Sequence, residues 1–246
     1  MPLPRIRTIA VTAAAALAVT ATLGCGFISA AGNIAHNISL IGDLADKMKA
    51  SEQSTFQAGY QLDDGSTVTV AQQPPNSATV GDKGRFIGTA DAWYMCDKET
   101  GSWACQRTPN QGTDTSDAPM AAGLLGAGFV SAPMAIAVLT VASITPNAKV
   151  AQSTETIAGQ KSTCAKVSNL EQAQQDQQDK VKDFTVCVTE SGILARFAGT
   201  STDGTKGKVE LVSYTDKVDG SLFQPPAGAK ITDTTDLTNT PEPTNS

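Results

Sequence analysis

The chain has 246 residues, of which 17% are charged and 5% aromatic, and its formal net charge is −6. A nucleic-acid-binding protein would carry a basic face with stacking aromatic rings, so this composition excludes that class and no nucleic acid is expected as a partner. The single histidine, His36, excludes sites that need several imidazoles. The length allows one large domain or two small ones.

Residues 1–24 are predicted to form a signal peptide. Two arginines precede an uncharged run from Ile9 to Leu23, and its length of about 15 residues suits a signal-peptide core but is short for a membrane span. The run ends in Gly24-Cys25, which resembles a bacterial lipobox. Cys25 would then become the first mature residue and carry acyl chains. Cleavage after Ala31 is the alternative.

The number of cysteines supports acylation of Cys25. There are five, and an odd cysteine in an exported protein needs an explanation. The expected product is anchored to the outer face of the cell membrane through Cys25, with residues 25–32 as a lipidated tether. The remaining cysteines can pair completely; they are Cys96, Cys105, Cys164 and Cys187.

The spacing of the four cysteines favours two bonds, each within one strand pair. A two-residue loop at Thr100-Gly101 places Cys96 opposite Cys105, about 4.5–5.5 Å away and within disulfide reach. Cys164 and Cys187 lie on the next two expected strands, at 161–167 and 183–189. Four cysteines allow three pairings, and neighbours are chosen because each bond then closes locally. Cys187 would lie on the face opposite Phe184, Val186 and Val188. The disulfide would then leave that apolar face free to line an interior space.

Periodicity predicts the remaining elements. Apolar residues at helical spacing predict a helix within 33–50, and alternation from Phe56 to Val70 predicts a hairpin around Asp63-Asp64-Gly65. The tail, 231–246, is too polar to bury apolar surface and is expected to be disordered. Shorter strands are expected at 78–80, 85–89, 92–96, 193–197 and 208–214.

The segment from Ala118 to Ala148 has no charged side chain, and three interpretations compete. A transmembrane helix is disfavoured because glycines and Pro133 interrupt it and because later cysteines would face a reducing cytoplasm. The other two place helices at Pro119–Gly128 and Pro133–Ser143 on the sheet. They differ in whether the interior is filled or forms a ligand cavity, and the abundance of small residues favours a cavity.

The ending Phe223-Gln-Pro225-Pro226-Ala227-Gly228 after the last strand, and the opening Tyr60-to-Val70 hairpin, are similar to the LprG/LppX-type lipoproteins of actinobacteria and the related LolA fold. The resemblance spans most of residues 33–230. It implies one α+β domain: a curved antiparallel half-barrel sheet, with an N-terminal helix and a central apolar helix pair capping its concave face.

The function expected from these features is binding or carriage of a lipid or other apolar ligand between sheet and helices. The alternative is an envelope sensor or accessory lipoprotein that binds a partner protein through the same fold. No catalytic motif such as GxSxG, SxxK or HExxH occurs, so no enzyme activity, cofactor or metal is expected. The candidate ligand-lining residues are Phe56, Tyr60, Leu124, Leu125, Phe129, Met134, Val138, Val186 and Phe197.

Overall fold

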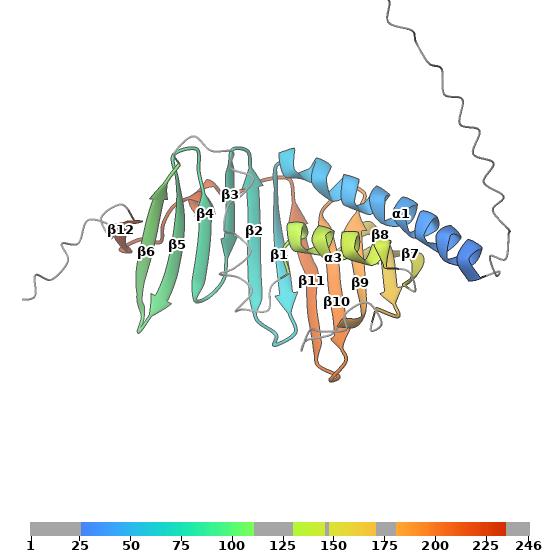
Figure 1. Cartoon of the computed structure of the whole chain (residues 1–246). Helices are drawn as coiled ribbons and strands as arrows, with labels where there is room; N and C mark the ends of the chain where they lie inside the picture. Colours follow the sequence, from blue (N-terminus) through green and yellow to red (C-terminus); the bar gives the residue numbers. More distant parts are fainter. Residues whose placement is uncertain (1–25, 111–129, 146–147, 171–180, 235–246) are drawn as a thin grey trace, which may run out of the picture.

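Twelve strands form one continuous sheet in the computed structural model, which describes residues 26–110, 130–145, 148–170 and 181–234 (Figure 1). The strand order is β12-β6-β5-β4-β3-β2-β1-β11-β10-β9-β8-β7. The strand bounds are β1 Phe56–Leu62, β2 Thr67–Gln73, β3 Asn76–Val80, β4 Gly84–Gly88, β5 Ala92–Glu99, β6 Ser102–Pro109, β7 Lys149–Ile157, β8 Gln160–Ser168, β9 Val181–Thr189, β10 Leu194–Ser201, β11 Lys206–Thr215 and β12 Lys230–Asp233.

The expected α+β fold with a central apolar helix pair is wrong. The sheet is mixed, because β12 pairs parallel with β6 while the other neighbours are antiparallel. Local hairpins that periodicity predicts separately join into one sheet because β1 pairs with β11 across a long stretch of sequence. The result is mostly β structure, and the residues that the structure describes form only two α-helices.

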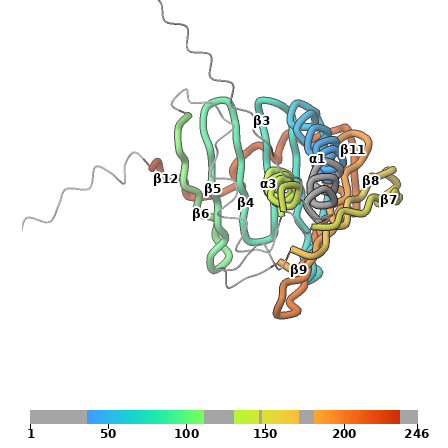
Figure 2. The backbone as a smooth tube through the Cα atoms, turned by 45° about the vertical axis from the view of Figure 1, so that its right-hand side comes forward, coloured from blue at the N-terminus to red at the C-terminus, as the bar shows by residue number. Residues whose placement is uncertain are grey.

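The two α-helices lie on the same face of the sheet, over the half that runs from β1 to β7 (Figures 1 and 2). They are α1 (Gly26–Ala50) and α3 (Ala132–Ile144). Helix α1 begins before the helix predicted within 33–50 and takes in most of the expected tether. Helix α3 matches the second member of the predicted pair, whereas Pro119–Gly128 lies outside the described residues.

One apolar core lies between these helices and the sheet. Ile41, Leu44 and Met48 of α1 share it with Leu139 of α3, and all four are almost fully buried. The strands β8, β9 and β10 supply the facing side chains, which are Ala165, Val167, Phe184, Val186, Val188 and Leu194. We call this cluster the helix–sheet core.

The C-terminal segment covers the opposite face of the other half of the sheet. There the 3₁₀ helix η4 (Gly220–Phe223) places Phe223 against Ala71, Ala78 and Ile87 of β2, β3 and β4. Beyond it, β12 pairs with β6, so strand structure extends to Asp233. The last three residues of β12, Ile231 to Asp233, lie within the region expected to be disordered.

The turn after β9 fits tightly against α1. Gly192 has a positive φ of 84°, and a Cβ placed on it would collide with the carbonyl oxygen of Lys47 near the end of α1. Only glycine combines this backbone conformation with so close an approach. The contact sets the distance between the end of α1 and the β9–β10 turn.

Candidate apolar binding layer

Helix α3 is apolar on both its buried and its exposed sides. Pro133 lies in its first turn, where the missing N–H leaves no hydrogen bond unmade. Leu139 is fully buried against the helix–sheet core, whereas Val141 and Ile144 are 54% and 63% exposed. No residue of α3 carries a charge. A helix that is apolar all round is typical of one that is covered on both sides.

The polar side chains of α3 bond to the helix itself. The hydroxyl of Thr140 donates to the carbonyl of Ile136 at 2.8 Å. Ser143 donates to Thr140, and Thr145, just past the helix, donates to Val141. Because these hydroxyls bond to backbone carbonyls of the helix, the contact between α3 and the sheet is made by apolar side chains.

Three of the predicted lining residues meet in the helix–sheet core. Val186 of β9 is fully buried there, and Phe197 of β10 and Val138 of α3 pack against it while remaining partly exposed. The ring of Phe197 stacks on that of Phe184, with centroids 5.9 Å apart and planes 13° from parallel. A fourth predicted residue, Met134, is half-buried on α3 and is not a member of this core.

The other predicted lining residues do not join this group. Phe56 and Tyr60 of β1 are buried in a neighbouring cluster with Val209 and Leu211 of β11. Val130, which packs against both clusters, connects them. Leu124, Leu125 and Phe129 lie outside the described residues.

Cross-strand register shows that the helix-facing side of the sheet is one largely apolar surface. One row of successive partners runs from β8 to β1 through Ala165, Val186, Phe197, Val209 and Leu62. A second row runs from β1 to β5 through Ala58, Val70, Thr79, Phe86 and Met95. Ala58 and Leu62 alternate along β1 on the same face. We call these two rows the apolar layer.

The aromatic end of this layer was not predicted from the sequence. On the same face as Met95, Trp93 packs its ring against Phe86, with centroids 5.3 Å apart. The Trp93 ring also lies directly over Gly88, where a Cβ would collide with it. Trp93 and Met95 are two residues apart in one expected strand, and Phe86 and Gly88 are two apart in another. This spacing places each pair on one face of its strand.

Burial changes the chemistry of one residue in the second cluster. Tyr60 is 3% exposed, and removal from water raises the pKa of its phenol well above the ordinary value of 10.0. The phenol therefore stays neutral at alkaline pH values where an exposed tyrosine ionises. Its ring contributes apolar area to the cluster of Phe56, Val209 and Leu211.

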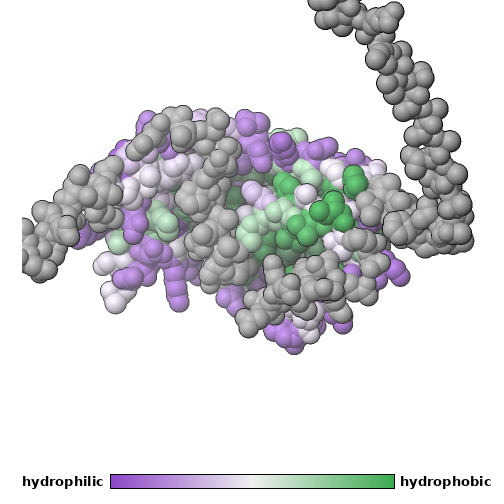
Figure 3. Space-filling model, viewed as in Figure 1, coloured by the Kyte–Doolittle hydropathy of each residue, from purple (hydrophilic) through white to green (hydrophobic). Residues whose placement is uncertain are grey.

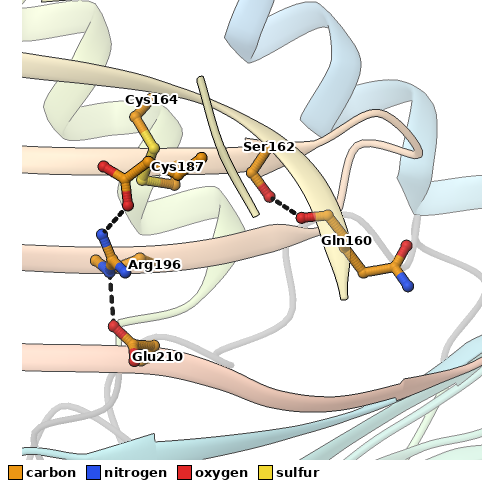
Figure 4. The surroundings of a disulfide bond; sticks show 7 residues. Gln160, Ser162, Cys164, Cys187, Arg196 and Glu210 are labelled. Atoms are coloured by element: carbon orange, nitrogen blue, oxygen red, sulfur yellow. Dashed lines mark hydrogen bonds and ion pairs between the residues drawn. A yellow bond between two sulfur atoms is a disulfide. The ribbon is translucent and has the colours of Figure 1, made fainter. Parts of the chain in front are cut away.

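The face opposite the apolar layer carries a polar network beside a disulfide (Figure 4). Arg196 of β10 donates from Nη1 to Glu155 and from Nε to Glu210, both at 2.6 Å. The carboxylate of Glu155 also lies within 4.8 Å of the sulfurs of Cys164 and Cys187. Because both sulfurs are in a disulfide and the carboxylate is paired with Arg196, this group does not fit a metal ion.

Both predicted disulfides are present. Cys96 bonds to Cys105 and Cys164 to Cys187, and each pair is directly opposed in its hairpin, with Cα atoms 4.0 and 3.9 Å apart. The second bond lies on the face opposite Val186, as expected. Disulfides persist in oxidising compartments, so the pair indicates an exported protein.

Within the described ranges, neither helix has the length and hydropathy to span a bilayer. No protein-family model matches the chain, and no curated protein matches it either. A similar solved structure is that of an uncharacterized conserved protein from Thermus thermophilus. The two share 9% identity over 78% of this chain and 98% of that chain, with a TM-score of 0.43. This likeness is too low to assign a function.

Proposed function

We propose that the protein is an exported lipoprotein, anchored through an acylated Cys25, that binds a lipid or another apolar ligand between α3 and the apolar layer. The proposal includes no catalytic step and needs no cofactor or metal ion. The lipobox-like sequence and the odd cysteine support the membrane anchor. The apolar surfaces of α3 and of the strands beneath it support the ligand site.

The observation that carries the proposal is the apolar nature of the contact between α3 and the sheet. The hydroxyls of Thr140, Ser143 and Thr145 bond to backbone carbonyls of the helix and its end. Val138 of α3 and Phe197 of β10 both pack against the apolar helix–sheet core. An acyl chain that entered here would replace one set of apolar contacts by another and would leave no polar group unpaired.

Such binding needs no directional contacts. Each buried CH₂ group contributes about 0.8 kcal/mol, so a long acyl chain binds through its length alone. The aromatic end of the layer, at Phe86 and Trp93, extends the surface beyond the helices. Ligands with long chains are therefore expected to bind better than short ones.

The test is lipid extraction from the chain exported and purified without detergent. The expected result is a stoichiometric apolar molecule in the wild type and much less of it in Val138→Phe, whose larger side chain fills the contact between α3 and the sheet. The matched control is Val212→Phe on β11, a half-exposed valine outside the helix–sheet core. It should retain the ligand. Thermal unfolding of both variants checks that they remain folded.

An empty wild-type protein would contradict the proposal. Equal lipid content in Val138→Phe and the wild type would also contradict the proposed position. An empty interior together with specific capture of another envelope protein would instead favour the partner-binding alternative.

A further inference from the structure

The outer side of the helix layer carries an exposed apolar area that the proposed ligand site does not use. Ile38 of α1 is 48% exposed, and Val141 and Ile144 of α3 are 54% and 63% exposed. We call these three residues the outer patch. Figure 3 shows hydrophobic side chains gathered over α3 and the adjacent part of α1.

The end of α3 that carries the patch is joined to α1 at a defined point. The side chain of Asn37, next to Ile38, donates to the carbonyl of Ala148 at 3.0 Å in the segment that follows α3. Ile41, one turn further along α1, packs with Leu139 and Ala142 of α3 in the helix–sheet core. The two parts of the patch therefore lie on one rigid unit.

The N-terminal region of the sequence supports a membrane as the occupant of the patch. Helix α1 begins at Gly26, directly after Cys25 and the apolar run Ile9–Leu23. In the acylated form that we propose, Cys25 is at the membrane and α1 follows it directly in sequence. A helix rises about 1.5 Å per residue, so Ile38 lies roughly 18 Å along α1 from its first residue, Gly26.

The charge pattern along α1 agrees with this position. Residues 26–42 contain no Asp, Glu, Lys or Arg, and the first charge of the helix is Asp43. Helix α3 has none either. A charge at a bilayer interface is tolerated where it reaches water, and residues 26–42 and α3 carry none.

We propose that the outer patch rests on the bilayer that holds the anchored chain, so that α1 and α3 lie along the membrane surface. The proposal relies on the proposed function only for the anchor. Three half-exposed side chains bind weakly by themselves, and the anchor makes the contact by holding the patch beside the bilayer. The occupant is zwitterionic lipid, because no basic residue of α3 or of residues 26–42 calls for an anionic one.

The test uses the chain from Gly26 to Ser246, which includes every described residue, with a hexahistidine tag in place of Cys25. The tag tethers it to phosphatidylcholine vesicles that contain nickel-chelating lipid. A polarity-sensitive fluorophore is attached through Val141→Cys, and in a second sample through Val212→Cys, which is 50% exposed on β11. Spin-labelled phosphatidylcholine serves as a quencher confined to the bilayer.

The expected result is a blue shift and loss of most of the fluorescence at position 141, with little change at position 212. Adding Ile38→Ser and Ile144→Ser should remove the quenching at position 141. Equal quenching at both positions, or quenching that survives these substitutions, would overturn the proposal. A blue shift that grows with protein concentration before vesicles are added would also overturn it, because a second copy would then cover the patch.

The tether replaces the acyl anchor, so this result does not depend on modification of Cys25. It does not depend on an internal ligand either. If position 141 is not quenched but the protein contains stoichiometric lipid, only the docking surface is overturned. If position 141 is quenched but the protein contains no apolar ligand, only the ligand site is overturned.

Discussion

The side-chain amide of Asn37 donates a 3.0 Å hydrogen bond to the backbone carbonyl of Ala148, more than one hundred residues away in sequence. Asn37 is 3% exposed and Ala148 is 2% exposed. The bond joins α1 to the segment between α3 and β7. It is therefore a buried polar contact at one end of the helix layer, whose other contacts with the sheet are apolar.

Replacing Asn37 by alanine should lower the free energy of unfolding by about 1–3 kcal/mol, because a buried carbonyl loses its donor. Chemical denaturation measures the change. Asn110→Ala is the matched control, since its side chain also donates to backbone carbonyls, those of Thr89 and Ala90, but at a more exposed position. Equal losses in the two variants would show that burial of the Asn37 bond has no special effect.

Gly192→Ala should destabilise the protein more than Gly204→Ala. Both glycines have a positive φ, 84° and 88°, so both substitutions impose a similar backbone strain. Only at Gly192 would the new Cβ collide with another segment, at the carbonyl of Lys47 in α1. We expect a loss of about 1 kcal/mol for Gly204→Ala and a clearly larger one for Gly192→Ala. Indistinguishable melting temperatures would mean that the turn does not press on α1.

Removing either disulfide should destabilise the protein, and the bond that closes the longer loop should matter more. The bonded cysteines are 9 residues apart in Cys96–Cys105 and 23 apart in Cys164–Cys187. The chain-entropy relation gives about 2.6 kcal/mol for the shorter loop and about 3.4 kcal/mol for the longer one. Paired alanine substitutions are preferable to serine because all four positions are buried. A larger effect at Cys96–Cys105 would contradict this order.

Alkaline pH should destabilise the protein partly through Tyr60. Burial raises the pKa of its phenol in the folded state, while the unfolded chain titrates near 10.0. The stability that Tyr60 contributes is thus fully present below pH 10.0 and is lost as the pH rises above it. Relative to Tyr60→Phe, the wild type should lose about 1.4 kcal/mol more per pH unit above this value. Parallel stability curves for the two proteins, measured from pH 8 upward, would contradict the assignment.

The sequence predicted local pairs well. Alternation from Phe56 to Val70 indicated the β1–β2 hairpin, and a two-residue loop at Thr100-Gly101 placed Cys96 opposite Cys105. Both signals are local, since the residues that pair are close in the chain. The helical spacing of Ile38, Ile41 and Met48 likewise predicted a helix. Ile41 and Met48 face the core as expected, whereas Ile38 of the same stripe is half-exposed.

Longer-range features could not be predicted in this way. β7 is polar at most positions, with only Ile157 fully buried, because it is an edge strand that pairs with β8 alone. β12 lies in a polar tail and forms only because β6 offers a free edge. The single sheet depends on β1 meeting β11, and nothing local in either strand specifies that partner. These pairings explain why twelve strands replace the expected helix-capped α+β domain.

The candidate site was predicted only in part, because some of its residues are placed by local patterns and others by long-range strand pairing. Val138, Val186 and Phe197 meet because α3 and the alternation of β9 could both be inferred from the sequence. Phe56 and Tyr60 lie in the neighbouring cluster, since β1 is displaced from β9 by two intervening strands. The pair Phe86 and Trp93 joins the layer only through the register of β3, β4 and β5.

The most direct measurement of the central claim is nuclear magnetic resonance of the chain from Gly26 to Ser246 with carbon-13-labelled palmitic acid as the probe. Isotope-filtered Overhauser spectra detect protons within a few ångströms of the acyl chain. We predict cross-peaks from the acyl chain to the methyl groups of Val138 and Val186, on opposite sides of the contact between α3 and the sheet. Cross-peaks only to exposed methyl groups such as those of Val212, or none at all, would contradict an apolar ligand site in this layer.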